Sequence, residues 1–277
     1  MNTTMDLTQT KGQHMPVFAQ ATLEQHLRDA ITQELLTLHF QPIHSSQGDL
    51  IAFEALCRWN DDDFGVINPD QFIPLAERLG LMESLGSWVL TQACRQGAWL
   101  QSKTQEILIS VNVSPSQLLQ ADFVELVHRA LTAAGLPAGS LRLEISEHTL
   151  IDMETCLAHL YDLRALGVQI AMDDFGQGNS NFGKMTALPL HILKLDRHFV
   201  QDIHQEPRTQ ALVKGIVQLA QRLGYQVIAK GVETETERQT LEALGCDALQ
   251  GFLFSKAIPI FDAMAYVAER QFLADQA

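Results

Sequence analysis

Polar and charged side chains recur at the ends of short apolar runs along this 277-residue chain. They are Glu54, Asn112, Glu144, Glu147, Asp173, Asp174, Lys194, Asp196, Lys230 and Gln250. Carboxylates and amides are the oxygen donors that hard divalent cations such as Mg²⁺ and Mn²⁺ prefer. Taken singly, an acidic residue at a strand end is more simply a helix cap or a solvated group. Taken together, the set predicts a metal site, provided that the fold brings its members to one place.

Eight short apolar runs predict the strands that would position these side chains. The runs lie at 36–43, 50–57, 107–113, 141–146, 168–173, 191–195, 226–229 and 247–250. Helical patterns separate most of them; within 121–135, for example, Phe123, Val127 and Leu131 share one face. Alternating strands and helices predict a parallel sheet, and eight strands in a chain of this length favour a closed (β/α)8 barrel. The carboxyl ends of barrel strands open onto one mouth, so the polar residues would meet there.

The start of the chain departs from a regular barrel. Only about six residues (HSSQGD) separate the first two predicted strands, too few for a crossover helix, so these strands should be antiparallel. The expected fold is therefore α/β, a modified TIM (β/α)8 barrel with an antiparallel first strand. Residues 1–20 are polar and without clear period, which predicts a flexible N-terminal segment before a barrel domain at 21–277.

Composition narrows the partners and the compartment. The chain has 33 acidic and 19 basic residues and a formal charge of -14, which argues against DNA as a partner. The four cysteines are widely separated, without a CxxC pair, so they indicate neither a zinc site nor a disulfide framework but a reducing compartment. The sequence has no apolar run of about 18 residues, so we expect no membrane insertion and a cytoplasmic location.

Several motifs, in order, give the chain a family resemblance. Glu54-Ala55-Leu56 is followed by Arg58 in the stretch FEALCRW. The other motifs are FQPI (40–43), PDQFIPLAE (69–77), SVNVSPSQL (110–118), LRLEISEHTL (141–150), AMDDFGQGNSNF (171–182), LPLHILKLDRHFV (188–200) and LQGFLFSKAIP (249–259). From about residue 22 to about residue 268 the chain resembles the EAL domains, which hydrolyse or sense cyclic di-GMP.

The resemblance implies roles for the residues at matching positions. Glu54, Asn112, Glu144 and Asp173 would bind a first Mg²⁺ or Mn²⁺, and Asp173 would bridge to a second ion held also by Asp174. At the catalytic positions, Lys194 would orient the attacking water, Glu147 would anchor the loop after the fifth strand, and Lys230 stands where the family has a glutamate. The implied substrate contacts are Gln41, Leu56, Arg58, Asp196 and Gln250. Two cations would support hydrolysis of cyclic di-GMP to pGpG. The resemblance is compatible with a homodimer and with a protein partner.

Lys230 is the departure with the largest chemical consequence. The family motif AEGVET reads AKGVET here, and the replaced glutamate is a ligand of the second metal in the family. At about 4 Å and an effective dielectric near 20, each unit of the changed charge interacts with a divalent ion by roughly 8 kcal/mol before hydration. Lys230 could place its ammonium where the second cation would bind, or extend to solvent and leave a weak second site. The first arrangement predicts a receptor and the second a slow enzyme.

Three hypotheses therefore stand at the level of the sequence. The first is an EAL-type cyclic di-GMP phosphodiesterase site in which Lys230 impairs turnover, with one metal ion expected and the second weakened. The second is a catalytically inactive cyclic di-GMP receptor that signals through a protein partner. The third is a scaffold that binds no nucleotide. Further departures follow the fifth strand, where Gln177, Asn179 and Asn181 replace the usual Thr or Ala, Tyr or Phe, and Ser.

Overall fold

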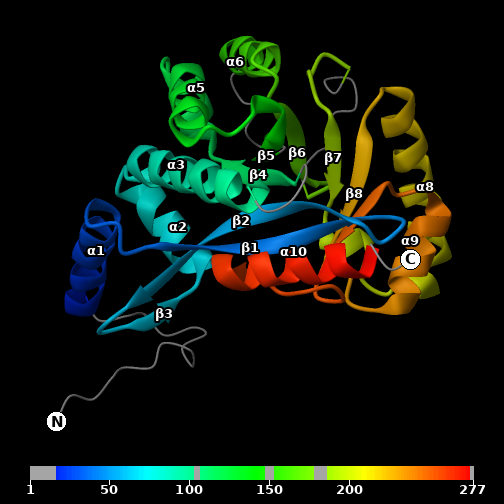
Figure 1. Ribbon diagram of the computed structural model, residues 1–277, viewed down its shortest axis with the longest axis horizontal. Helices are drawn as coiled ribbons and strands as arrows, with labels where there is room; N and C mark the ends of the chain where they lie inside the picture. The colour runs from blue at the N-terminus through cyan, green and yellow to red at the C-terminus, as the bar shows by residue number, and fades with distance from the viewer. Residues whose placement is uncertain (1–16, 103–106, 147–152, 178–185, 275–277) are drawn as a thin grey trace.

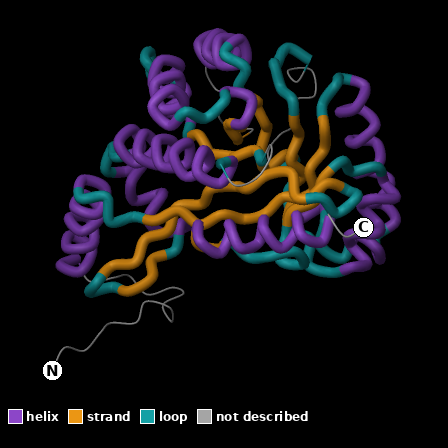
Figure 2. The backbone as a smooth tube through the Cα atoms, in the orientation of Figure 1, coloured by secondary structure: helices purple, strands orange, loops and turns teal. Residues whose placement is uncertain are grey.

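The computed structural model describes residues 17–102, 107–146, 153–177 and 186–274, and these form a closed barrel with helices around it (Figure 1 and Figure 2). Its eight strands are β1 (Thr37–Ser45), β2 (Leu50–Asp61), β4 (Leu108–Val113), β5 (Leu141–Ser146), β6 (Gln169–Phe175), β7 (Ile192–Leu195), β8 (Gln226–Lys230) and β9 (Ala248–Gln250). All eight predicted strands are present. Two short strands that the sequence did not predict, β3 (Gly65–Ile67) and β10 (Ile258–Pro259), pair with β2 and β1.

Strand directions confirm the expected modification of the barrel. Strand β1 pairs antiparallel with β2 on one side and with β9 on the other, whereas neighbouring strands from β2 through β4 to β9 are parallel. The β1–β2 connection is too short for a helix, which forces the chain to reverse direction there. The fold is therefore an α/β barrel of the TIM type with an antiparallel first strand.

The helices cover the outside of the barrel. They are α1 (Val17–Thr32), α2 (Pro69–Arg78), α3 (Met82–Gln101), α4 (Pro115–Leu118), α5 (Phe123–Ala134), α6 (Met153–Ala165), α8 (Pro207–Arg222), α9 (Glu235–Leu244) and α10 (Ile260–Ala274), with short 3-10 turns η2 (Ala138–Ser140), η4 (Arg197–Phe199) and η5 (Ile203–Gln205). In α5, Phe123, Val127 and Leu131 are buried, as their spacing predicted. Among the helices of the described ranges, none combines the length and apolar character needed to cross a membrane.

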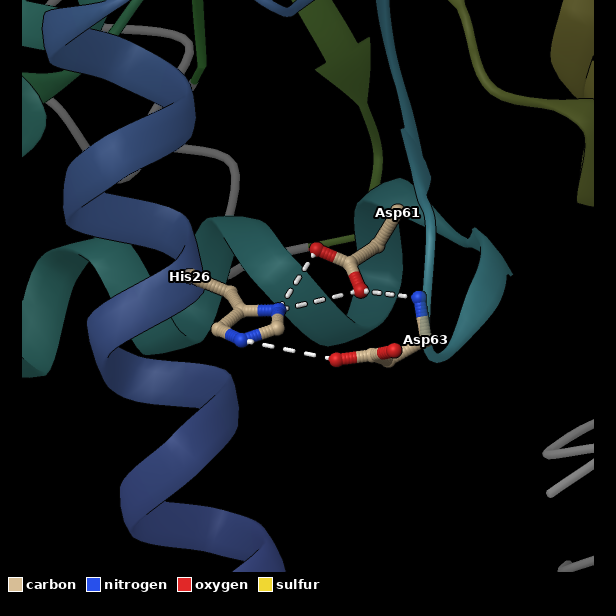
Figure 3. A group of neighbouring side chains, drawn as sticks. All are labelled: His26, Asp61 and Asp63. Atoms are coloured by element: carbon tan, nitrogen blue, oxygen red, sulfur yellow. Dashed lines mark hydrogen bonds and ion pairs between the residues drawn. The ribbon is translucent and has the colours of Figure 1, made fainter. Parts of the chain in front are cut away.

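Helix α1 is attached to the end of β2 through polar contacts (Figure 3). The ring of His26 places Nδ1 2.9 Å from Asp61 Oδ2, and its Nε2 lies 3.8 Å from Asp63 Oδ2. Phe64 meets the same imidazole edge-on, with ring centroids 5.6 Å apart. The helix begins at Val17, so the last four residues of the segment expected at 1–20 are helical, and residues 1–16 lie outside the described ranges.

The barrel interior is built in layers because side chains alternate between the two faces of each strand. A small apolar layer takes one residue from each of six strands: Ile43, Ala52, Ala171, Ile192, Ile228 and Ala248. Between the barrel and the helices lies a second, much larger apolar cluster. Two positions beyond the small layer, toward the carboxyl ends of the parallel strands, the inward residues become polar. In β1, which runs in the opposite direction, the matching residue comes two positions earlier.

Candidate active site

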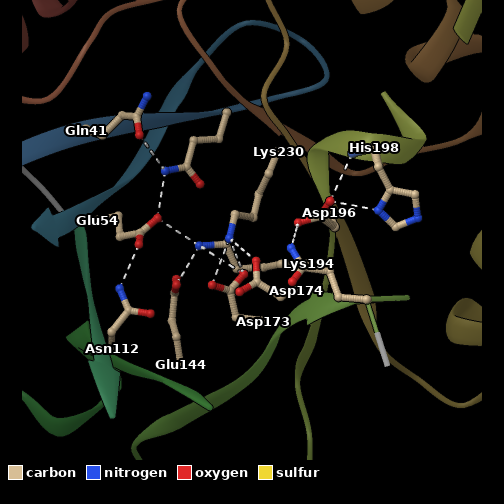
Figure 4. A network of polar contacts seen from close by, with 12 residues as sticks. Gln41, Glu54, Asn112, Glu144, Asp173, Asp174, Lys194, Asp196, His198 and Lys230 are labelled. Atoms are coloured by element: carbon tan, nitrogen blue, oxygen red, sulfur yellow. Dashed lines mark hydrogen bonds and ion pairs between the residues drawn. The ribbon is translucent and has the colours of Figure 1, made fainter. Parts of the chain in front are cut away.

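Each barrel strand contributes one side chain to a polar layer above the small apolar layer (Figure 4). In strand order they are Gln41, Glu54, Asn112, Glu144, Asp173, Lys194, Lys230 and Gln250. The strand register supports the layer, since Gln41 is opposite Glu54, Asn112 is opposite Glu144, and Lys230 is opposite Gln250. The structure therefore brings together, at one end of the barrel, seven of the ten residues that the sequence placed at strand ends, with Gln41 as the eighth member of the layer.

Lys194 lies at the centre of the layer and is fully buried. Its Nζ is 2.9 Å from Glu54 Oε2, 2.5 Å from Glu144 Oε2 and 4.0 Å from Asp173 Oδ1. Burial alone would lower the pKa of Lys194, but the charges of Glu144 and Glu54 outweigh burial and raise the pKa. The side chain is therefore a buried ammonium ion shared among carboxylates.

The two buried glutamates have opposite pKa shifts. Burial raises the pKa of Glu54, but Lys194, Lys230 and a hydrogen bond from Gln250 outweigh burial and lower the pKa to about 2. For Glu144, burial and the neighbouring charge of Glu54 raise the pKa to about 7. Glu54 also accepts hydrogen bonds from Asn112 Nδ2 at 2.8 Å and Gln250 Nε2 at 2.7 Å. When its three carboxylates are ionised, the layer holds one more negative charge than its two lysines neutralise.

Three carboxylates of the layer suit one divalent cation. Glu54, Glu144 and Asp173 each offer an oxygen, and the three oxygens lie within 4.8 Å of one another. Asn112 is next to this group through its contact with Glu54. An all-oxygen donor set of carboxylates fits a hard divalent cation.

Lys230 points into the site rather than toward solvent. Its Nζ donates to Asp173 Oδ1 at 2.7 Å, to Asp173 Oδ2 at 2.8 Å and to Asp174 Oδ1 at 2.8 Å. The side chain is 22% exposed, and its three ammonium protons are matched by these three oxygens. Burial lowers the pKa of Lys230, but the charges of Asp173, Glu54 and Asp174 outweigh burial and raise the pKa. The structure has the first of the two arrangements considered for Lys230, with its ammonium against Asp173 and Asp174.

A distortion of β6 lets two consecutive aspartates reach the same lysine. In a regular strand Asp173 and Asp174 would point to opposite faces. Here the pairing of β6 with β7 shifts register between Met172 and Phe175, and Asp174 has a φ of 52°. Aspartate is one of the few residues that tolerate this left-handed region.

A groove of about 480 Å³ opens beside the polar layer and is lined in part by α2 and α3. Leu56, Arg58, Asn112 and Asp174 line it. Arg58 is half-buried, and its Nη1 donates to Cys57 O at 2.9 Å. Two of the predicted substrate contacts, Leu56 and Arg58, therefore share one groove with two of the predicted metal ligands.

The remaining predicted substrate contacts lie in two places. Gln41 joins the layer, since its Oε1 accepts from Gln250 Nε2 at 3.2 Å and its Nε2 donates to Ser255 O at 3.3 Å. Asp196 follows β7 and accepts hydrogen bonds from Gln177 and His198. The sequence predicted neither of these contacts of Asp196. The only signal for His198 was its position two residues after Asp196. Glu147, Asn179 and Asn181 lie outside the described residues.

Known proteins with similar sequences support one family. The chain is 40% identical over 252 residues to the bifunctional diguanylate cyclase/cyclic di-GMP phosphodiesterase MucR of Pseudomonas aeruginosa, covering 90% of this chain and 37% of that protein. It is 36% identical over 251 residues to the cyclic di-GMP phosphodiesterase PdeR of Escherichia coli K12, covering 90% of this chain and 38% of that protein. The chain thus spans less than two fifths of the length of these relatives.

A solved structure and a family model agree with these relatives. The cyclic di-GMP complex of the PaMucR phosphodiesterase superposes with a TM-score of 0.82 at 39% sequence identity, covering 87% of this chain and 99% of that chain. The family model described as the EAL domain matches residues 24–257. This chain belongs to the EAL domain family.

Proposed function

We propose that the chain binds cyclic di-GMP at the polar layer and the adjacent groove, and that hydrolysis to pGpG there depends on Mg²⁺ or Mn²⁺ and is slowed by Lys230. One observation carries binding and metal-dependent hydrolysis: oxygens of Glu54, Glu144 and Asp173 lie within 4.8 Å of one another, and the groove lined by Arg58 opens beside them. The ammonium of Lys230, 2.7–2.8 Å from oxygens of Asp173 and Asp174, supports the slowing of turnover. In this proposal one divalent ion binds at Glu54, Asn112, Glu144 and Asp173, and Lys230 takes the place of a second.

The residues of the chain have distinct tasks in this proposal. Arg58 presents a planar guanidinium fork to a phosphate in the groove, and Leu56 packs beside the ligand. Gln41 and Gln250 hold the edge of the layer through their mutual hydrogen bond. Lys194 keeps Glu54 and Glu144 in place, and in this proposal it also orients the attacking water. A bound divalent cation would lower the pKa of the attacking water and would neutralise charge on the leaving oxygen.

Lys230 weakens this chemistry without removing recognition. An ammonium can balance the charge of Asp173 and Asp174, but it does not activate water as a divalent ion does. Its three protons already have partners among the aspartate oxygens, so it has no free donor for the phosphate. In this proposal Arg58 binds the phosphate without help from this lysine, and the first cation site shares only Asp173 with the hydrogen bonds of Lys230.

The contact of Lys230 with Asp173 and Asp174 is the arrangement expected of the second hypothesis, a cyclic di-GMP receptor without turnover that reports occupancy to a protein partner. The receptor and the slow enzyme share the ligand and differ only in chemistry at the phosphate. The scaffold hypothesis is less well supported, because the described members of the predicted metal and ligand set, apart from Asp196, lie in one layer and one groove.

Product formation distinguishes these functions. Wild type and Lys230→Glu are incubated with cyclic di-GMP and Mg²⁺ or Mn²⁺, and pGpG is followed by chromatography. We expect Lys230→Glu to form pGpG at least tenfold faster, since about 1.4 kcal/mol of transition-state stabilisation gives that factor. Lys214→Glu makes the same charge change on an exposed face of α8 and should leave the rate unchanged.

Binding is measured separately by calorimetry. Wild type that binds cyclic di-GMP and forms no pGpG would be a receptor. Equal rates for wild type and Lys230→Glu would contradict the role given to Lys230, and absence of binding in both would contradict cyclic di-GMP recognition.

A further inference from the structure

Asp196 is a buried carboxylate whose two oxygens are both occupied by side chains of the protein (Figure 4). Its Oδ1 accepts from the backbone N–H of His198 at 2.9 Å and contacts His198 Nδ1 at 2.7 Å. Its Oδ2 accepts from Gln177 Nε2 at 2.5 Å. Only 7% of the Asp196 side chain is exposed, so a ligand reaches this carboxylate only after one of these partners moves.

Asp196 is one of the substrate contacts that the family resemblance implies, and we propose that Gln177 occupies in the free protein the acceptor that a guanine base would use, so that Gln177 and guanine compete for Asp196. This inference rests on the proposed function, because it assumes that cyclic di-GMP binds at this end of the barrel. Gln177 is then a residue that sets ligand affinity and base specificity.

The chemistry of the donors supports the competition. Guanine presents adjacent N1–H and N2–H donors, and an ionised carboxylate is an acceptor for both. The carboxamide N–H of Gln177 is a donor of the same kind at the same oxygen. Burial raises the pKa of Asp196, but the hydrogen bonds from His198 and Gln177 outweigh burial and lower the pKa. Asp196 therefore stays ionised as an acceptor.

Of the two partners, Gln177 is the one that can leave. His198 donates from its backbone as the second residue of the Asp196-capped turn η4, so this contact is part of the local fold. Gln177 is exposed and follows Gly176, which has a φ of 100°. A Cβ on Gly176 would lie 2.2 Å from Phe199 Cε2, so the backbone of this turn packs directly against η4. The turn places the Gln177 side chain over Asp196, and only this side chain must rotate to free the oxygen.

The test is a calorimetric titration with cyclic di-GMP of wild type, Gln177→Leu and the control Gln201→Leu. Leucine keeps the approximate size of Gln177 and removes the donor. We expect Gln177→Leu to bind cyclic di-GMP about tenfold more tightly, because the ligand no longer displaces a hydrogen bond to a charged group. Gln201 is also exposed, and its substitution should leave the dissociation constant unchanged.

Two further measurements separate competition from a general effect on the site. Cyclic di-AMP has adenine bases without an N1–H donor, so Gln177→Leu should not gain affinity for it. In an Asp196→Asn background the gain from Gln177→Leu should disappear. Unchanged or weaker binding of cyclic di-GMP by Gln177→Leu, an equal gain for cyclic di-AMP, or a gain that persists in Asp196→Asn would overturn the inference. Failure of wild type and all variants to bind cyclic di-GMP would instead reject the proposed function itself.

Discussion

At the scale of single residues, the proposed function depends most on Lys230. The described layer and its neighbour Asp174 hold four carboxylates (Glu54, Glu144, Asp173 and Asp174) and two ammonium groups (Lys194 and Lys230). When all are ionised, this set carries two negative charges, which one divalent cation balances. With glutamate at position 230 the same set would hold five carboxylates and one ammonium, and its four negative charges would suit two divalent cations. The charge balance therefore favours one ion.

Lys194 is expected to stabilise the protein most in the absence of divalent cations. Lys194→Met removes a fully buried ammonium and leaves Glu54 and Glu144 without their shared partner. Breaking a buried pair in this way costs about 3–5 kcal/mol. We therefore expect a large loss of unfolding free energy in urea denaturation with a chelator, and partial recovery with Mn²⁺, because an ion replaces the missing positive charge.

The control for Lys194 is a lysine outside the site. Lys214→Met on α8 removes an exposed ammonium and should change the unfolding free energy by no more than about 0.5 kcal/mol, with or without Mn²⁺. A Lys194→Met protein as stable as wild type, or one indifferent to Mn²⁺, would contradict this account of the buried lysine.

His44 gives the stability a pH dependence that is independent of the site. It is fully buried, stacks on Phe254 with ring centroids 4.5 Å apart, and lies 3.1 Å from the Tyr266 hydroxyl through Nε2. Burial, aided by the charge of Arg270, lowers the pKa of His44 to about 4 from an ordinary value near 6.5. Between these values the unfolded chain binds a proton that the folded protein excludes.

The contribution of His44 is therefore complete above pH 6.5 and is lost as the pH falls toward 4. Protonation of His44 over that interval lowers the free energy of unfolding by at most about 3 kcal/mol. His44→Phe keeps an aromatic ring against Phe254 but cannot titrate, so its unfolding free energy should fall less steeply than that of wild type between pH 6.5 and 4. Parallel curves for the two proteins, measured by urea denaturation at each pH, would show that His44 is not responsible.

At the scale of elements, the contact of His26 with Asp61 predicts that this pair stabilises the packing of α1 against the end of β2 (Figure 3). His26→Ala removes this part-buried pair and the edge contact with Phe64, at a cost of about 0.5–1 kcal/mol. Because the loss is confined to one helix, hydrogen exchange should accelerate in α1 and stay unchanged in α5. His128→Ala, a substitution of an exposed residue on α5, is the control. If His26→Ala left hydrogen exchange in α1 unaltered, the contact of His26 with Asp61 would not stabilise this helix.

The strands were predictable because their pattern is local. A strand buried in a barrel is a short apolar run, and the polar residue that ends the run marks the layer of the site. Strands β3 and β10 escaped prediction because they have three and two residues and exist through pairing with β2 and β1. Their positions depend on tertiary contacts rather than on any local pattern.

The contacts within the site were less predictable than its membership. Side chains alternate between the two faces of each strand, so the sequence pattern predicts which of them point into the barrel. Glu54, Glu144 and Asp173 are three of these, and they meet there. The direction of Lys230 depends on the β6 distortion that presents Asp173 and Asp174 together, and a sequence gives no sign of that distortion. Gln177 reaches Asp196 across two loops, which no spacing rule predicts.

For the whole molecule, the location of positive charge matters more than its amount. The chain carries a formal charge of -14, so an anionic dinucleotide is repelled by most of its surface. Arg58 at the groove, with a divalent cation in the layer, would provide the local positive charge that such a ligand needs. The relatives extend well beyond the matched region.

The most direct test of the account is the number of divalent ions bound with cyclic di-GMP. Crystals of wild type and of Lys230→Glu, grown with Mn²⁺ and cyclic di-GMP, are compared by anomalous scattering from manganese. We predict one Mn²⁺ in wild type, at Glu54, Glu144 and Asp173, and two in Lys230→Glu. Two ions in wild type, with Lys230 turned away from Asp173 and Asp174, would contradict the central claim that this lysine takes the place of the second cation.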